Sequence, residues 1–598
     1  MEDHEMQVKT KFQKSVQRVI AFAIVLVVLT TIAWAIASSG GRVRISRTEY
    51  VSNGGATMSG WMYTPKGVSD ENPAPAIVDF HGRNTTAYNI IAWAIEQSRR
   101  GYVVFLPDQQ RTNESLAVEG NTTARIAVSA VQYLESQDFI TEVSAAGHSA
   151  GNQALGALIQ NEEVQKSLKN IVSVGNMFVM VRGVPEYTNY LSIEAQKDFY
   201  ATNEFKIPTR ADKLVCAEQQ FGIENLVEGK VYGDPKEGTT REFLMLNTTH
   251  QQQMYSGPVI EAMLSFIELS SPAPNPIRND SQVFWWCYIV LALCTIVFVF
   301  LIAEFAHMLA LSPLFCGTVL TERPASQGKS KEKWIKQVAL DYLIPIISFA
   351  PVTMFIAKHN PVGLFRFGFV NQIFLWIFFV GMVGAVILVF RYKKASKERK
   401  LSAVDYGMGT DKEPVLVWKR IRDGFLIATL TTIMMFTILD IVCKCTGLNY
   451  QFFCIFAQFN RLTPERFVAT LPYLVLCIAL LIVININIAT SRRTKDSGNE
   501  NKDTVKDIII NILLSAGSLS LLFAIEFIGI RLSPDGVAPL SLSTFGALAF
   551  ALCFPFMMSC SAGMSSYLYR KTGNIWTGVF TSSFILIFLT CNAALFTA

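Results

Sequence analysis

The chain has 598 residues, more than one hydrophobic core usually serves, so its length predicts at least two domains. Apolar residues make up 51% of the chain and charged residues only 17%, which argues against a wholly soluble protein. The net charge of +5 does not indicate a nucleic-acid partner, because the Lys and Arg residues gather in short segments between long apolar runs. We therefore expect a membrane protein that binds no nucleic acid.

The first apolar run, residues 19–37, follows a short basic segment at residues 1–18. Its last residues, Ala35-Ile36-Ala37, resemble a signal-peptidase site, but the run is longer than the roughly 7 to 15 apolar residues of a signal peptide. We expect an uncleaved transmembrane anchor behind a cytoplasmic N-terminal segment, with cleavage as the alternative. In either case the chain that follows is exported.

Residues 38–270 are predicted to form an extracytoplasmic domain in which strands alternate with helices. Apolar runs of strand length lie at 76–80 and 102–106, and helical spacing is found at 85–98 and 122–134. This alternation predicts an α/β fold with a doubly wound, mainly parallel sheet that is covered on both faces.

A further strand is predicted at 143–146, and it leads directly into Gly147-His148-Ser149-Ala150-Gly151 and a helix at 154–168. A serine in a sharp strand-to-helix turn is a nucleophile elbow, and small neighbours permit the strained turn that presents its hydroxyl above the sheet. We expect the backbone N–H of Ala150 to face the developing oxyanion, with a second donor near Gly82 in the loop after an earlier strand. The alternative is a plain glycine-rich helix start.

The general base is predicted by elimination among the three histidines of this domain. His81 lies in the proposed oxyanion loop, and His148 is the variable position of the elbow. His250 follows a strand-like run at 243–246 and precedes a helical stretch at 259–267. A histidine after the last strand is where the chain order serine, acid, histidine requires the base, so the sequence predicts His250.

The acid of the triad is the least defined member. It should lie between Ser149 and His250, and no run there reads as an apolar strand followed at once by Asp. Asp234 stands at the end of the strand-like Val231-Tyr232-Gly233 and is the predicted acid. The alternatives are Glu186, Glu218 and Glu224.

From about residue 43 to residue 268 the chain resembles the α/β-hydrolase superfamily, and within it the dienelactone-hydrolase and acyl-peptidase-like serine hydrolases. The resemblance rests on Gly101-Tyr102-Val103-Val104, on Pro107-Asp108 and on the elbow around Ser149. It implies hydrolysis of an ester, thioester or amide through an acyl-enzyme, without a metal ion or organic cofactor. The aromatic-rich segment 178–231 is predicted to be a cap over an acyl pocket, with core packing as the alternative.

A stiff, polar linker at 271–283 is expected to separate this domain from a membrane domain at 284–598 with about eight transmembrane helices. These spans are centred on residues 284–303, 342–357, 367–390, 425–442, 467–489, 508–530, 540–558 and 575–597. Alternate connections are basic, so the positive-inside rule places the N-terminus in the cytoplasm and the soluble domain and C-terminus outside it. The sequence therefore predicts a multi-pass protein of the cell membrane.

Together these features predict a membrane-embedded serine hydrolase of esterase, lipase or peptidase type. Its expected partners are membrane lipid and a small-molecule, lipidic or cell-envelope acyl substrate. The alternative from another class is a transporter or membrane receptor with an inactive hydrolase-like binding domain, which would depend on Asp440 and Glu526 in the spans rather than on Ser149. An acyltransferase that uses the same site residues is the third hypothesis.

Overall fold

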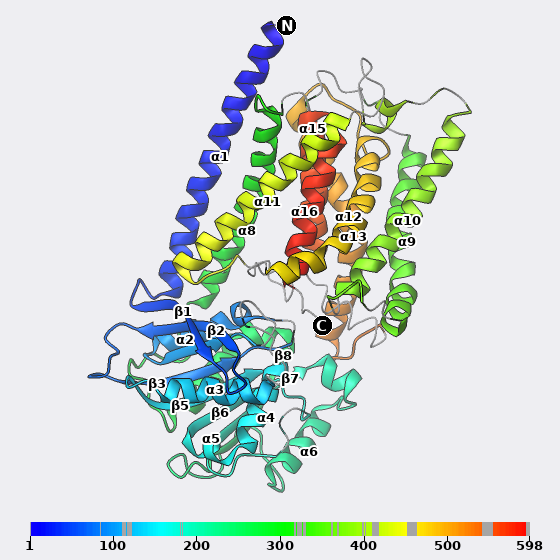
Figure 1. Ribbon diagram of the computed structural model, residues 1–598. Coiled ribbons are helices and arrows are strands. Elements are labelled where there is room, and N and C mark those ends of the chain that lie inside the picture. Colours follow the sequence, from blue (N-terminus) through cyan, green and yellow to red (C-terminus); the bar gives the residue numbers. More distant parts are fainter. Residues whose placement is uncertain are drawn as a thin grey trace.

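The structure is a computed structural model with two parts, a sheet domain and a bundle of long helices that lies against one side of it (Figure 1). It describes residues 2–83, 85–109, 115, 122–179, 181, 183–315, 319, 326, 330–359, 363–367, 370–397, 400, 402–408, 418–450, 463–540 and 554–593.

The sheet domain contains an eight-stranded mixed sheet in the order β1-β2-β4-β3-β5-β6-β7-β8. The strands are β1 (Val43–Val51), β2 (Thr57–Pro65), β3 (Ala74–Phe80), β4 (Val103–Pro107), β5 (Ile140–His148), β6 (Leu168–Val174), β7 (Asn189–Lys197) and β8 (Arg241–Thr249). β2 pairs antiparallel with β1 and β4, and the other neighbouring strands pair in parallel. The predicted α/β fold with a mainly parallel sheet is confirmed, although β1 and β2 were not predicted.

Helices cover both faces of this sheet, because its central strands are apolar on both sides; every residue of β4 is buried, for example. One face packs against α2 (Ile91–Arg99) and α7 (Gly257–Glu268), and its core continues into the long helices. The other face packs against α3 (Thr123–Glu135), α4 (Asn152–Gln160) and α6 (Arg210–Phe221). The predicted strands before and after the elbow and the helix before β5 are thus confirmed.

Two expectations for this domain are wrong. The helix predicted at 154–168 ends at Gln160, because the Asn161 side chain accepts a hydrogen bond from the Val164 N–H and starts a separate helix, α5 (Glu162–Ser167). The segment 178–231 is not a cap throughout, since it contributes β7 to the sheet. Its Tyr190 and Leu191 are fully buried core residues.

The long helices are α1 (Glu2–Ala37), α8 (Phe284–Leu311), α9 (Lys331–His359), α10 (Val370–Ala395), α11 (Trp418–Thr446), α12 (Pro464–Ala489), α13 (Glu500–Leu532), α15 (Phe554–Thr572) and α16 (Ile575–Ala593). Within the described residues, seven of them, α1 and α8 to α13, are long and apolar enough to cross a membrane, and α16 contains a shorter apolar helix. The span predicted at 540–558 falls largely outside the described residues.

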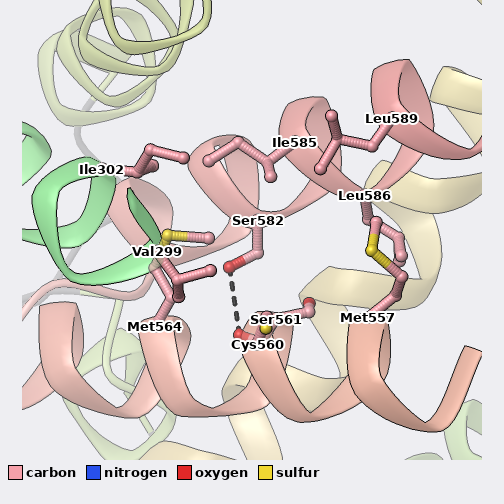
Figure 2. Close-up of a pocket in the computed structure, with 10 residues that line it drawn as sticks. All are labelled: Val299, Ile302, Met557, Cys560, Ser561, Met564, Ser582, Ile585, Leu586 and Leu589. Carbon is pink, nitrogen blue, oxygen red and sulfur yellow. Dashed lines mark hydrogen bonds between the residues drawn. The ribbon is translucent and has the colours of Figure 1, made fainter. Parts of the chain in front are cut away.

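The helical bundle is closely packed where α8, α15 and α16 meet. A cavity of about 20 Å³ lies between these helices and is walled by apolar side chains such as Val299 and Met564 (Figure 2). The Ser582 hydroxyl donates to the Ser561 carbonyl there, across 3.1 Å. That volume is close to what one water molecule needs. The interior of this part of the bundle therefore offers no room for a substrate.

The carboxyl ends of β7 and β8 face the helical bundle. Arg531 at the end of α13 donates to the Asn247 carbonyl across 3.1 Å, and Lys197 donates to the Arg531 carbonyl. Beside them the Thr202 hydroxyl donates to the Asp535 carbonyl across 2.8 Å. Phe199 packs in one apolar cluster with Ile530 of α13. The edge of the sheet where parallel strands end is thus held against the helical bundle.

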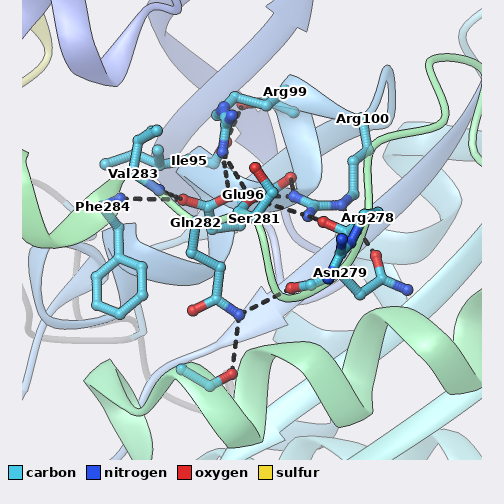
Figure 3. Close-up of polar contacts among 12 residues, drawn as sticks. Ile95, Glu96, Arg99, Arg100, Arg278, Asn279, Ser281, Gln282, Val283 and Phe284 are labelled. Atoms are coloured by element: carbon cyan, nitrogen blue, oxygen red, sulfur yellow. Dashed lines mark hydrogen bonds and ion pairs between the residues drawn. The ribbon is translucent and has the colours of Figure 1, made fainter.

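A second junction is built around Glu96 of α2, whose side chain is fully buried (Figure 3). Its carboxylate accepts the backbone N–H groups of Val283 and Phe284 at the start of α8, across 2.6 and 3.0 Å. It also pairs with Arg99 and with the fully buried Arg100, across 2.6 and 3.0 Å. A carboxylate at a helix N-terminus satisfies otherwise unpaired N–H groups, so this network fastens the sheet domain to α8.

Candidate active site

Ser149 stands at the turn between β5 and the short helix η2 (Ser149–Gly151), half-buried and with a φ of 53°. A left-handed backbone at a non-glycine residue is strained and is typical of a nucleophile elbow. The flanking glycines make the turn possible, because a methyl group at Gly151 would lie 2.2 Å from the Phe80 carbonyl oxygen. A methyl group at Gly147 would lie 2.9 Å from Gly151. The predicted strand, turn and helix around Ser149 are therefore present.

His250 directly follows β8 and is buried, and its imidazole is held on three sides. Its Nδ1 donates to Asp198 Oδ2 across 2.6 Å. Its ring lies 4.9 Å from that of Tyr200 and 5.0 Å from that of His148, between centroids. With Nδ1 protonated toward the carboxylate, the lone pair of a neutral imidazole is on Nε2, as a general base requires.

Asp198 is the carboxylate beside His250, and sequence reasoning missed it. It follows β7 directly, is completely buried, and its Oδ1 accepts the N–H groups of Tyr200 and Ala201 across 2.9 and 3.2 Å. Burial by itself raises the pKa of this carboxyl, but the charge and hydrogen bond of His250 and the charge of Lys213 outweigh it, so the net pKa is lowered. Asp198 is therefore held as a carboxylate.

The structure does not bring Asp234 to His250. Asp234 lies in an exposed turn, where its Oδ1 accepts the N–H of Lys236 across 2.8 Å. Of the alternatives, Glu186 and Glu224 are exposed, and Glu218 accepts the N–H of Leu226 across 3.1 Å. The strand-like run before Asp234 forms only an isolated bridge between Tyr232 and Arg241. Asp198, and not Asp234, is the carboxylate in contact with His250, so the predicted acid is corrected to Asp198.

His148, the variable residue of the elbow, holds the chain at His250. Its Nε2 donates to the His250 carbonyl oxygen across 3.0 Å. Burial lowers the pKa of His148 to about 3, and the nearby His250 adds to this shift, so the ring is neutral. Since a carbonyl can only accept, the proton of His148 is on Nε2. His148 therefore holds the backbone of His250 in place and does not act as a second general base.

The loop after β3 passes next to the nucleophile. A methyl group at Gly82 would lie 3.2 Å from the Cβ of Ser149, so only glycine fits here without displacement. The Thr85 hydroxyl donates to the Gly82 carbonyl across 2.7 Å, and His81 Nδ1 donates to the same oxygen across 2.9 Å. Gln109 donates to the His81 carbonyl. Gly82 and the buried Ala150 are thus both at Ser149, and their service as oxyanion donors stays a prediction.

A second buried acid, Glu194 of β7, lies near the triad. Its Oε1 accepts the N–H groups of Asn176 and Met177, both across 3.1 Å, in the loop after β6. Burial raises the pKa of Glu194 to about 8, and the charge of Asp198 adds to the rise. The buried Lys213 donates to two β7 carbonyls beside it, across 3.1 and 2.7 Å. The charge of Lys213 acts to lower the pKa of both carboxyl groups, Glu194 and Asp198.

We expect Glu194→Gln to raise the melting temperature at alkaline pH. An acid whose pKa is raised on folding stabilises the fold below its unfolded pKa of about 4.3, and this contribution is lost as the pH rises through about 8. Thermal unfolding should give equal melting temperatures for both proteins near pH 4 and a value several degrees higher for the variant near pH 9. Parallel profiles across this range would contradict the buried, protonated Glu194.

Among the described residues, no group of three or more His, Cys, Asp or Glu side chains could hold a metal ion. The polar groups of the site are instead arranged in pairs, Asp198 with His250 and His148 with the His250 backbone.

Comparisons with known proteins concern the fold. No protein-family model matches the chain, and no curated protein matches its sequence. The Pyrococcus furiosus esterase Pf2001 is similar at 10% identity and a TM-score of 0.29, over 39% of this chain and 94% of the esterase. Est1E from Butyrivibrio proteoclasticus, with bound ferulic acid, is similar at 13% identity and a TM-score of 0.27, over 37% and 99%. Brefeldin A esterase, a bacterial homologue of human hormone sensitive lipase, is similar at 12% identity and a TM-score of 0.28, over 42% and 85%.

Proposed function

We propose that this protein is a membrane-embedded serine hydrolase that cleaves an ester, thioester or amide bond through an acyl-enzyme on Ser149. The observation that carries the proposal is the 2.6 Å contact between His250 and the buried Asp198, on the loops that follow β8 and β7. A strained serine turn at the end of β5 completes the order serine, acid, histidine along the chain. No metal ion or organic cofactor is required by this chemistry.

The mechanism follows from these positions. His250 Nε2 takes the proton of the Ser149 hydroxyl as its oxygen attacks the substrate carbonyl, and the bond to the leaving alcohol, thiol or amine then breaks. His250 returns the proton to the leaving group. A water molecule, deprotonated by His250, then attacks the acyl-enzyme, and the acid product leaves with Ser149 restored. The N–H groups of Ala150 and of the Gly82 loop hold the negative charge of the tetrahedral intermediates.

Labelling by a fluorophosphonate probe tests this proposal in the full-length protein. We expect covalent labelling of the wild type and none of Ser149→Ala, because the probe reacts only with an activated serine. Ser136→Ala is the matched control, since Ser136 is exposed on the surface and should leave labelling intact. Equal labelling of Ser149→Ala and wild type would remove the proposal.

We further propose that the sheet domain lies outside the cytoplasm and the N-terminus within it. In the structure the N-terminus lies at the end of the bundle away from the sheet domain (Figure 1). Arg18 of α1 pairs with Glu304 there, and Arg570 pairs with Asp496, each across 2.7 Å. Basic residues at this end of the bundle agree with the positive-inside rule.

An inactive hydrolase-like binding domain would not need an acid beside the histidine. The buried carboxylate that contacts His250 therefore favours the enzyme over this alternative. Acyl transfer to an alcohol or amine would use the same residues, with the acceptor replacing water in the second step.

A further inference from the structure

A crevice of about 1280 Å³ lies between helices of the bundle and reaches the sheet domain at one end. One wall is α11, from Phe425 to Lys444, and the facing wall is formed by α12 and α16. The sheet domain closes one end with three side chains, Arg47, Trp61 and Tyr88. The crevice is far larger than the 20 Å³ cavity of Figure 2, and its lining includes residues of both parts of the protein.

The walls of the crevice are mostly apolar and are about as long as the hydrocarbon core of a bilayer is thick. The lining on α11 extends over roughly 28 Å, at about 1.5 Å per residue, close to the roughly 30 Å of a hydrocarbon core. The side chains of α12 and α16 that line the crevice are Phe467, Leu471, Leu474, Val475, Ile478, Phe584 and Phe588. Such a surface suits a hydrocarbon chain, since burial of apolar area is its main source of affinity.

Charged groups gather at the end of the crevice beside the sheet domain. Lys444 pairs with Asp440 across 2.7 Å, and Arg47 pairs with Asp108 across 2.7 Å. The Arg47 guanidinium also lies 5.3 Å from the centre of the Trp61 ring. An apolar length with a polar end matches an amphiphile whose head is at the sheet domain and whose tail is among the helices.

Two short sets of contacts lead from this end to the nucleophile. Tyr88 belongs to the short helix η1 (Ala87–Ile90), which begins two residues after Thr85, the residue that donates to the Gly82 carbonyl. Asp108, the partner of Arg47, precedes Gln109, whose N–H donates to His81 Nε2 across 3.1 Å. The loop that contacts Ser149 is therefore also the loop that borders the crevice.

We propose, on the basis of the hydrolase function above, that this crevice admits a membrane-lipid ester laterally and holds its hydrocarbon chain while the ester is cleaved at Ser149. The substrate class is then a long-chain lipid ester rather than a water-soluble one. The reaction consumes one water and releases a fatty acid and an alcohol. The acyl–oxygen bond breaks, and the alcohol leaves with the proton returned by His250.

The proposal is tested by two substitutions that narrow the crevice and leave the buried core unchanged. Leu471 and Val475 line the crevice and are 39% and 67% exposed, so Trp can replace both without overpacking. Val468 on the same helix is 64% exposed and does not line the crevice, which makes Val468→Trp the matched control. The full-length protein is assayed in detergent with p-nitrophenyl palmitate and p-nitrophenyl acetate. We expect the ratio of kcat/KM for palmitate to that for acetate to fall about tenfold or more in the double variant and to stay at the wild-type value in the control.

An unchanged ratio in the double variant, or an equal change in the control, would overturn the crevice proposal. If the wild type hydrolyses neither ester, the hydrolase function fails separately, and a photoactivatable phospholipid with a diazirine in its acyl chain tests the crevice alone. Crosslinks on α11 and α12 peptides that the double variant loses would support lipid binding. Crosslinks that the double variant keeps in full would refute it.

Discussion

Replacing Asp198 by Asn is expected to lower kcat for ester hydrolysis by about 10³ to 10⁴-fold. The carboxylate accepts the Nδ1 proton of His250 across 2.6 Å and so keeps the lone pair on Nε2. Asparagine has nearly the same shape, but it can offer its amide N–H to Nδ1 and so favour the wrong tautomer, and it carries no charge to stabilise the imidazolium. Steady-state kinetics of the purified full-length protein measures the loss.

Asp234→Asn is the matched control, since it makes the same chemical change in an exposed turn. We expect the kcat of this variant to equal that of the wild type. A large loss in Asp234→Asn together with a small loss in Asp198→Asn would show that the acid lies where the sequence suggested and not where the structure has it. Near-normal melting temperatures for both variants would exclude unfolding as the cause.

Replacing Glu96 by Ala is expected to destabilise the protein by about 3 to 5 kcal/mol. The substitution leaves the fully buried Arg100 without its charged partner and the N–H groups of Val283 and Phe284 without their acceptor (Figure 3). The melting temperature in detergent should fall by on the order of 10 °C, given about 2 to 4 °C per kcal/mol for a domain of this size.

Glu162→Ala provides the comparison for a surface pair. Glu162 pairs with Lys166 across 2.5 Å one helical turn away, and both side chains are largely exposed. Solvent screens such pairs, so we expect almost no change in melting temperature. A similar small effect in Glu96→Ala would mean that water reaches the junction between the sheet domain and α8.

Those parts of the site that depend on local pattern could be predicted from sequence. The elbow at Ser149 needs a strand, small flanking residues and a helix, all within a dozen positions. His250 could be predicted because the domain holds only two other histidines, His81 in the loop after an earlier strand and His148 within the elbow. The alternation of strands and helices was enough to predict the mainly parallel sheet.

Asp198 was missed because its position depends on a strand that was not recognised. β7 contains Glu194 and two asparagine or glutamine side chains, so it does not read as a plain apolar run, and the aromatic residues around it suggested a cap. The helix α6 and the turn around Asp234 lie between β7 and β8, so the acid stands 52 residues before His250. The apolar residues Tyr190, Leu191 and Ile193, all buried in β7, were the available signal.

The large crevice could not be predicted, because it depends on how α11 lies relative to α12 and α16. Hydropathy gives the length of each span but not which faces meet. The same apolar side chains, such as Leu474 and Ile478, would suit a helix interface or a lipid-facing surface equally well.

The sheet domain is tethered to the bundle at both of its ends. α1 leads into β1, α7 leads through residues 269–283 into α8, and α1 and α8 pack side by side along their length (Figure 1). A domain with one connection can rotate relative to its anchor, whereas a domain connected through two adjoining helices keeps a fixed orientation relative to them. For the lipid ester proposed above as substrate, this fixed arrangement implies arrival by diffusion in the plane of the bilayer. Its encounter rate depends on its mole fraction among the surrounding lipids rather than on its concentration in water.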